Sequence, residues 1–211
     1  MAATHPGSLQ WGRLLLHPWA KAWVFALALL PFGALVWALV FDQLGANPAE
    51  ALVRSSGDWT LRALCLVLAL TPLRVSLGWS GLARFRRMLG LFVYFYAALH
   101  LLSYLWFDMG FELADVVRDI AKRPFILVGF AAFVLLTALA VTSHNRLVRW
   151  LGGKLWKRLH QTVYLVAGLA VLHFFWMRAG KNDFAEVAVY AALLGTLLGW
   201  RLVKFLKKKA F

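Results

Sequence analysis

Residues 89–107 of the chain read LGLFVYFYAALHLLSYLWF, a stretch without a charged side chain. An α-helix rises about 1.5 Å per residue, so about 20 apolar residues cross the hydrocarbon core of a bilayer. A helix also satisfies its own backbone hydrogen bonds, which strand or irregular backbone exposed to lipid cannot do. This stretch therefore predicts a membrane-spanning helix, and it places His100 inside the membrane.

The rest of the chain has the same character. It has 211 residues, of which 62% are hydrophobic and only 15% are charged, with a mean hydropathy of +0.70. A soluble domain carries more charge than this. We therefore predict an all-α, polytopic membrane protein with one domain over residues 1–211, built as a bundle of six transmembrane helices. The expected spans are Ala22–Phe41, Trp59–Leu73, Leu89–Phe107, Pro124–Thr142, Leu159–Met177 and Phe184–Val203.

Two prolines refine these spans. Pro31 lies in the middle of the first span and should kink it, because proline removes a helical hydrogen bond. Thr71-Pro72 should mark the inner end of the short second span, since the residue before proline disfavours helical backbone.

The net charge is +14, and most of the basic residues fall on the opposite side of the predicted spans from the acidic residues. Most of the 23 Lys and Arg fall in the segments on one side of the six spans, whereas all nine Asp and Glu fall on the other side. The positive-inside rule places the basic side, and with it both termini, in the cytoplasm. Basic juxtamembrane segments attract anionic lipid headgroups. Because the basic residues are spread over several inner segments, we do not expect a nucleic-acid partner.

Two connecting segments should have structure of their own. The loop Ser143–Arg158 is basic and contains Gly152-Gly153, so it could lie along the inner surface as a broken amphipathic segment. The outer segment Asp108–Arg123 reads as a short helix. Its apolar residues should cluster on one face; these are Phe111, Val116, Val117 and Ile120.

The histidines are the candidate functional residues. An ionisable group inside a membrane is costly and indicates a functional site, and imidazole is a common axial ligand of haem iron. His100 and His173 both lie roughly 8–12 Å below the outer boundary of their spans at about 1.5 Å per residue. Equal depth on two helices is what a haem ligated from both sides requires. We therefore predict that His100 and His173 bind the iron of one haem.

His160 is a candidate for a second, inner haem. It lies about 20 Å below His173 along the fifth span, which would give electrons a route across the membrane. On a straight helix the two residues point about 140° apart, so their facing is not assured. No second inner ligand is identified, although His144 could serve. His5 and His17, like His144, lie in inner segments where exposure to solvent is expected.

Other interpretations stay open at this point. The histidines could be structural, hydrogen-bonded to a neighbouring hydroxyl or carbonyl, in a small membrane transporter or scaffold. The chain could also be a standalone transmembrane ferric reductase, although no nucleotide-binding domain is visible in the sequence. The single cysteine, Cys65, excludes an internal disulfide and a CxxCH site for covalent haem, so any haem is held by ligation and packing.

Several motifs resemble one known family over nearly the whole chain. They are LGANP (44–48), LTPLR (70–74), RRMLGL (86–91), LHLLSY (99–104), KRPF (122–125) and WKRLHQTVYL (156–165). The combination is similar to the MsrQ (formerly YedZ) family, the haem-binding membrane subunits of a bacterial methionine sulfoxide reductase system.

The resemblance implies a ferric-reductase-like transmembrane domain in the bacterial inner membrane, with one or two b-type haems between its helices. The family's histidines map onto His100, His160 and His173. The resemblance further implies an electron-transfer subunit, not the catalytic subunit, that serves a periplasmic molybdopterin enzyme, MsrP. The electron donor would be a cytoplasmic flavin reductase or the quinone pool. FMN is also associated with the family, and no residue here can be assigned to it.

Overall fold

The computed structural model describes residues 14–180 and 182–209, and in these residues it contains helices and no strand. The elements in chain order are α2 (Pro18–Val40), α3 (Pro48–Leu77), the 3-10 helix η1 (Ser80–Phe85), α4 (Arg86–Phe107), α5 (Leu113–Lys122), α6 (Pro124–Val141), α7 (Asn145–His160), α8 (Val163–Ala179) and α9 (Ala185–Lys209). Six helical segments are long and apolar enough to cross a membrane. The all-α fold and the six spans are confirmed.

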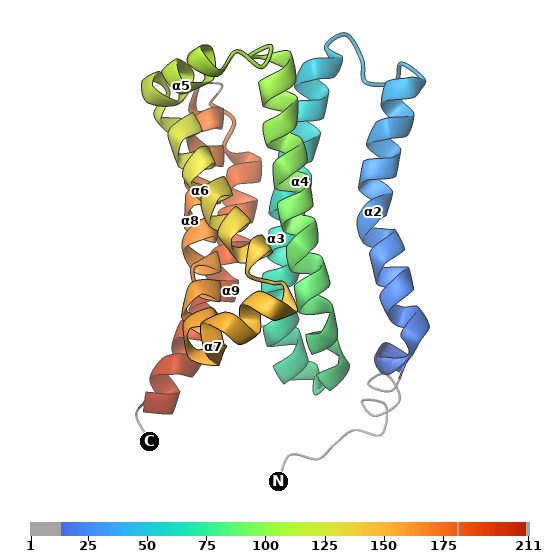
Figure 1. The fold of residues 1–211 in the computed structure, drawn as a ribbon, viewed down its shortest axis with the longest axis vertical. Helices are drawn as coiled ribbons and strands as arrows, with labels where there is room; N and C mark the ends of the chain where they lie inside the picture. Colours follow the sequence, from blue (N-terminus) through green and yellow to red (C-terminus); the bar gives the residue numbers. More distant parts are fainter. Residues whose placement is uncertain (1–13, 181, 210–211) are drawn as a thin grey trace.

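Five helices, α3, α4, α6, α8 and α9, form one bundle, and α2 stands beside it, next to α3 and α4 (Figure 1). The short helix α5 lies across one end of the bundle, and α7 lies across the other end (Figure 1). The beginning of α2 and the end of α9 are at the same end as α7.

The core lies between all five bundle helices. Its buried members come from every one of them and are small or branched, which lets the helices approach closely. They are Leu64, Leu68, Val93, Ala97, Leu136, Val166, Ala167 and Leu194. The most extensive pairings are α3 with α4 and α6 with α8. The bundle therefore contains two tightly packed helix pairs, and each pair carries one of the predicted intramembrane histidines.

Helix α2 contacts both α3 and α4, and a tyrosine of α4 makes hydrogen bonds to its backbone. The Tyr96 hydroxyl donates a hydrogen bond to the Ala28 carbonyl (2.7 Å) and accepts one from the Phe32 amide (3.2 Å). In a regular helix these two groups, four residues apart, would bond to each other, so the hydroxyl bridges one helical hydrogen bond of α2. Pro31 lies inside the helix next to this point.

The second span is longer than predicted at both ends, and its expected bounds, Trp59–Leu73, are wrong. It begins at Pro48 because the Asn47 side chain caps it, accepting a hydrogen bond from the Glu50 amide at 3.2 Å. The polar side chains of the first turns find partners within the helix. For example, the fully buried Ser56 hydroxyl donates to the Leu52 carbonyl (2.7 Å).

The same span continues past Pro72 to Leu77, so Thr71-Pro72 does not mark its inner end. Proline at 72 leaves the carbonyl of Leu68 without its helical donor. The guanidinium of Arg201, on α9, donates a hydrogen bond to that carbonyl. A side chain more than a hundred residues away thus compensates for the proline, and the helix ends at Gly78, which has the left-handed backbone (φ 70°) typical of a C-cap.

The predicted surface segments are both present. The segment after Ser143 forms α7, which is interrupted at Gly152 (φ 72°, ψ 154°), so the prediction of a broken helix is confirmed. The short helix predicted within Asp108–Arg123 is confirmed as α5. Of the residues predicted for its apolar face, Val116, Val117 and Ile120 lie in the helix, whereas Phe111 precedes it. Val116 is buried, and Val117 is exposed.

The fifth span does not start at Leu159 as predicted. Helix α7 ends at His160, the chain turns at Gln161 and Thr162, and α8 begins at Val163. In the turn, the Thr162 hydroxyl and amide both donate to the Leu159 carbonyl, at 2.7 and 3.0 Å. His160 and His173 therefore belong to two different helices, and the angle of about 140° expected on one straight helix does not apply.

Candidate functional site

His100 lies on α4 and points at α3. Its Nδ1 is 2.8 Å from the carbonyl oxygen of Val53, which is the geometry of an Nδ1–H donor and a carbonyl acceptor. Across the helix interface, the ring faces Gly57, four residues further along α3. An imidazole that donates from Nδ1 keeps a free lone pair on Nε2, the atom that binds a metal.

His173 is held in the same way by the other helix pair. It lies on α8, and its Nδ1 is 2.7 Å from the carbonyl oxygen of Phe125 on α6. The ring faces Gly129, which again follows the acceptor by four residues. The Phe125 ring itself lies 6.1 Å from the imidazole, centre to centre.

The two imidazoles face each other. Their ring centres are 6.2 Å apart, and their planes are inclined by 79°. Both residues are intermediate in exposure. The structure therefore brings together His100 and His173, the two residues that their equal depth had predicted as a pair.

Ion pairs fix the C-terminal end of α8 close to His173. Arg178, one turn beyond it, is almost covered and binds Asp183 at 2.9 Å and Glu186 at 2.5 Å. Its guanidinium also lies over the Phe174 ring, 5.4 Å from the ring centre. These contacts tie the end of α8 to the start of α9 and limit the movement of the His173 backbone.

His160 lies near the opposite end of the bundle. Its Nδ1 is 3.1 Å from the Trp156 carbonyl, its Nε2 is 3.5 Å from the Ser143 hydroxyl, and its ring stacks on that of Trp156 with centres 4.0 Å apart. As in the paired histidines, Nδ1 contacts a backbone carbonyl, but here the carbonyl belongs to the same helix. The structure does not bring His160 to the His100–His173 pair.

The remaining described histidines have a different role. His17 and His144 are exposed N-cap residues, whose Nδ1 atoms accept hydrogen bonds from the amides of Trp19 and Arg146. A neutral imidazole whose Nδ1 accepts a bond carries its proton on Nε2, so its Nε2 has no free lone pair for a metal. The prediction that both are exposed is confirmed, and His5 lies outside the described residues.

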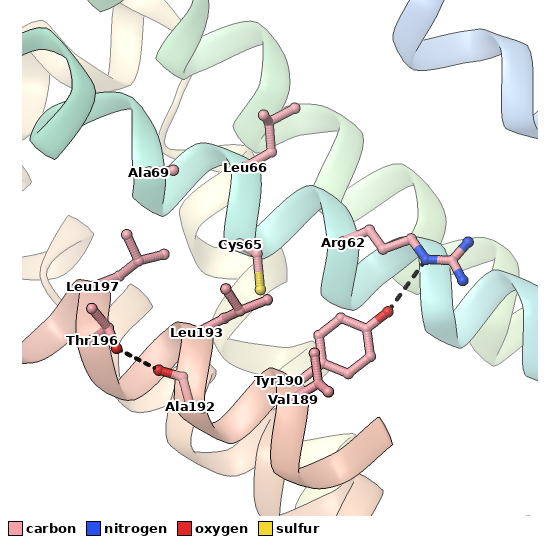
Figure 2. Close-up of a pocket in the computed structure, with 10 residues that line it drawn as sticks. All are labelled: Arg62, Cys65, Leu66, Ala69, Val189, Tyr190, Ala192, Leu193, Thr196 and Leu197. Carbon is pink, nitrogen blue, oxygen red and sulfur yellow. Dashed lines mark hydrogen bonds between the residues drawn. The ribbon is translucent and has the colours of Figure 1, made fainter. Parts of the chain in front are cut away.

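A groove of about 690 Å³ lies elsewhere, between α3 and α9. Figure 2 shows that it is lined by apolar side chains, with the Cys65 thiol among them and Arg62 reaching toward Tyr190. Arg62 Nε donates to the Tyr190 hydroxyl at 3.3 Å. Because these two polar groups bind each other, the groove does not offer the convergent free polar groups of a typical ligand site.

The histidine pair fits haem iron. An imidazole nitrogen lies about 2 Å from a metal that it binds, so two imidazoles on opposite sides of one ion have ring centres about 6 Å apart. Within the described residues, no group of three or more His, Cys, Asp or Glu is placed to hold a metal ion. Two facing imidazoles without further ligands suit a metal whose other four ligands come from a porphyrin. No comparable set of residues can be assigned to FMN.

Sequence reasoning identified the histidines and missed the groups that hold them. These are the carbonyls of Val53 and Phe125, and the two glycines that make room for the rings, Gly57 and Gly129. Backbone carbonyls give no sequence signal. Gly129 did give one, because glycine in the interior of an apolar helix is unfavourable and usually has a packing reason.

Comparisons with known proteins show the family of the chain. A family model described as "Ferric reductase like transmembrane component" matches residues 56–171, a range that includes His100 and His160 and ends two residues before His173. No solved structure matches the chain.

Curated relatives match along most of their own length. A protein of Polaromonas naphthalenivorans is 65% identical over 96% of this chain and 91% of the relative. Proteins of Herminiimonas arsenicoxydans (52% identical; 84% and 82% covered) and Bordetella pertussis (48%; 90% and 91%) are similar. All three are named protein-methionine-sulfoxide reductase heme-binding subunit MsrQ. The chain therefore belongs to the MsrQ family of heme-binding subunits, multi-pass membrane proteins with a ferric-reductase-like transmembrane component.

Proposed function

We propose that the protein is a membrane electron carrier that passes electrons from the cytoplasmic side or the quinone pool to a periplasmic molybdopterin enzyme, MsrP. That partner would reduce methionine sulfoxide in oxidised envelope proteins. The names of the relatives support the link to methionine sulfoxide reduction. The observation that carries the proposal is the facing pair of imidazoles inside a membrane-spanning bundle.

His100 and His173 would ligate the iron of one haem b near the end of the bundle that carries α5. Bound haem would supply a one-electron redox couple. The chain supplies the rest: the carbonyls of Val53 and Phe125 accept the Nδ1 protons, so both Nε2 atoms keep their lone pairs. Hydrogen bonding at Nδ1 also raises the basicity of the ligand nitrogen.

His160 would ligate or adjoin a second haem near the end that carries α7. Its Nδ1–H donates to the Trp156 carbonyl, and its Nε2 is 3.5 Å from the Ser143 hydroxyl. His144, considered above as its partner, is disfavoured because its Nδ1 accepts a bond as a helix cap. We assign no second ligand to this site.

The end of the bundle that carries α7 would face the cytoplasm, together with both termini. That end carries the basic residues of η1, α7 and the last turns of α9, whereas the ion pairs with Asp and Glu lie at the other end. The positive-inside rule supports this orientation. We further propose that residues 1–211 form one domain in the bacterial inner membrane. FMN remains a prediction from the family resemblance, without assigned residues.

Three single substitutions test the ligand pair. His100→Ala and His173→Ala should each abolish the same haem absorbance and lower haem per protein in a pyridine haemochrome assay. His144→Ala, at an exposed cap, is the matched control and should keep the full spectrum. A wild-type spectrum in either of the first two variants would refute the pairing. Absence of haem from the wild-type protein after haem-replete expression would favour structural histidines in a transporter or scaffold.

Electron transfer is tested on the same preparation. Reduced protein should be reoxidised by the periplasmic partner only when methionine sulfoxide is supplied. Reoxidation by ferric iron or oxygen alone, with no response to the partner, would contradict the proposed function and support a standalone reductase.

A further inference from the structure

The two proposed ligands are held by two copies of the same local arrangement. On α3, the Val53 carbonyl binds His100 and Gly57 follows four residues later; on α6, the Phe125 carbonyl binds His173 and Gly129 follows four residues later. We propose that Gly57 and Gly129 are positioning residues that fix the two imidazole planes in their nearly perpendicular orientation. This inference rests on the proposed ligation of haem iron by His100 and His173.

The spacing of four residues has a geometric reason. In an α-helix the carbonyl of one residue points toward the amide of the residue four positions on, and the two residues share a face. A carbonyl oxygen has two lone pairs, so the one not used by the helix can accept a bond from outside. A ring that approaches this lone pair lies over the residue four positions on, at the place where the Cβ atom of that residue would be. Glycine leaves that position open.

The distances show how little room remains. A Cβ added to Gly129 would lie 2.8 Å from Nδ1 and 2.9 Å from Cε1 of His173, and one added to Gly57 would lie 3.2 Å from the same two atoms of His100. In both cases the contact falls on the edge of the ring that makes the hydrogen bond. Alanine would therefore push away the hydrogen-bonded edge, and the ring would have to rotate or the helix pair would have to separate.

The chain provides matched controls on the histidine-bearing helices. Gly90 lies on α4 with His100, and Gly168 lies on α8 with His173. A Cβ added to either of them meets no atom within 4 Å. Replacing these glycines by alanine raises helix propensity as much as replacing Gly57 or Gly129 does, without touching a ring.

The angle between the planes is a measurable property. The present inclination of 79° is close to perpendicular. For an iron with two imidazole ligands, the relative orientation of the rings governs the anisotropy of the low-spin ferric EPR signal. Loss of the Nδ1 hydrogen bond also makes the ligand nitrogen less basic. A less basic ligand nitrogen stabilises ferric iron less, so the midpoint potential of the haem rises.

The experiment compares the full-length, haem-loaded wild type with G129A, G57A and the controls G90A and G168A. Gly129→Ala should weaken haem retention about tenfold, as expected for an overpacked site. It should also reduce the anisotropy of the EPR signal and raise the midpoint potential. Gly57→Ala should change the spectrum in the same direction by a smaller amount. Both controls should match the wild type in all three measurements.

The outcomes separate this inference from the proposed function. If His173→Ala loses its haem but G129A keeps the wild-type spectrum and potential, the ligand assignment stands and the positioning role is wrong. If His173→Ala keeps the wild-type spectrum, the ligand assignment itself fails. Should G129A not accumulate in membranes, G57A decides the question, because a wild-type EPR signal in that variant overturns the proposal.

Discussion

Arg201 provides the most direct test of how this bundle tolerates a proline inside a transmembrane helix. Pro72 lacks an amide proton, so the Leu68 carbonyl has no donor within α3. Arg201 donates to this carbonyl from one guanidinium nitrogen and to the Leu197 carbonyl of its own helix (3.0 Å) from another. Leu68 is 3% exposed, so water cannot replace the lost donor. We therefore expect Arg201→Ala to destabilise the protein through the orphaned carbonyl.

The expected magnitude follows from that carbonyl. A buried acceptor left without a partner costs about 1–3 kcal/mol. Replacing Pro72 by alanine supplies an amide at position 72 that can donate to Leu68 in the ordinary helical way. In a Pro72→Ala background, Arg201→Ala should therefore cost less, and the coupling energy between the two sites should be about 1–2 kcal/mol.

The assay is a double-mutant cycle on the unfolding free energy in detergent micelles, with the wild type, the two single variants and the double variant. Arg74→Ala, which removes an exposed guanidinium near the same end of α3, is the control and should change stability by less than about 0.5 kcal/mol. If the costs of Arg201→Ala and Pro72→Ala simply add in the double variant, the guanidinium does not serve the carbonyl and the reasoning is refuted.

Two further substitutions test how the peripheral helices are attached. Tyr96→Phe removes the hydroxyl between the Ala28 carbonyl and the Phe32 amide, so α2 should be less stably held, by about 1 kcal/mol. Amide exchange in residues 18–40 should accelerate, and unchanged exchange there would argue against this attachment. Tyr104→Phe removes the hydrogen bond to Asp119 (2.6 Å) that joins α4 to α5. Proteolysis within residues 113–122 should become faster, while exchange in α2 should stay as in the wild type.

The sequence alone determined the six spans, the side on which basic residues gather, and the two histidines at equal depth. These properties are local, because a bilayer selects long uncharged helices segment by segment. His100 and His173 could be matched by counting residues to the ends of their spans, without knowing which helices are neighbours. The same counting put His160 at the opposite end of the bundle, where it lies, but it did not show that the turn at Gln161 and Thr162 separates His160 from α8.

Only the tertiary structure decided what holds the histidines and where α3 ends. The bonds from His100 to Val53 and from His173 to Phe125 join residues 47 and 48 positions apart. The donor that lets α3 continue past Pro72 comes from a helix 133 positions after Leu68. Backbone carbonyls are alike in every residue, so a sequence does not show which of them has a free lone pair facing a neighbour. That depends on which helices pack together, and here it also sets the angle between the two imidazoles.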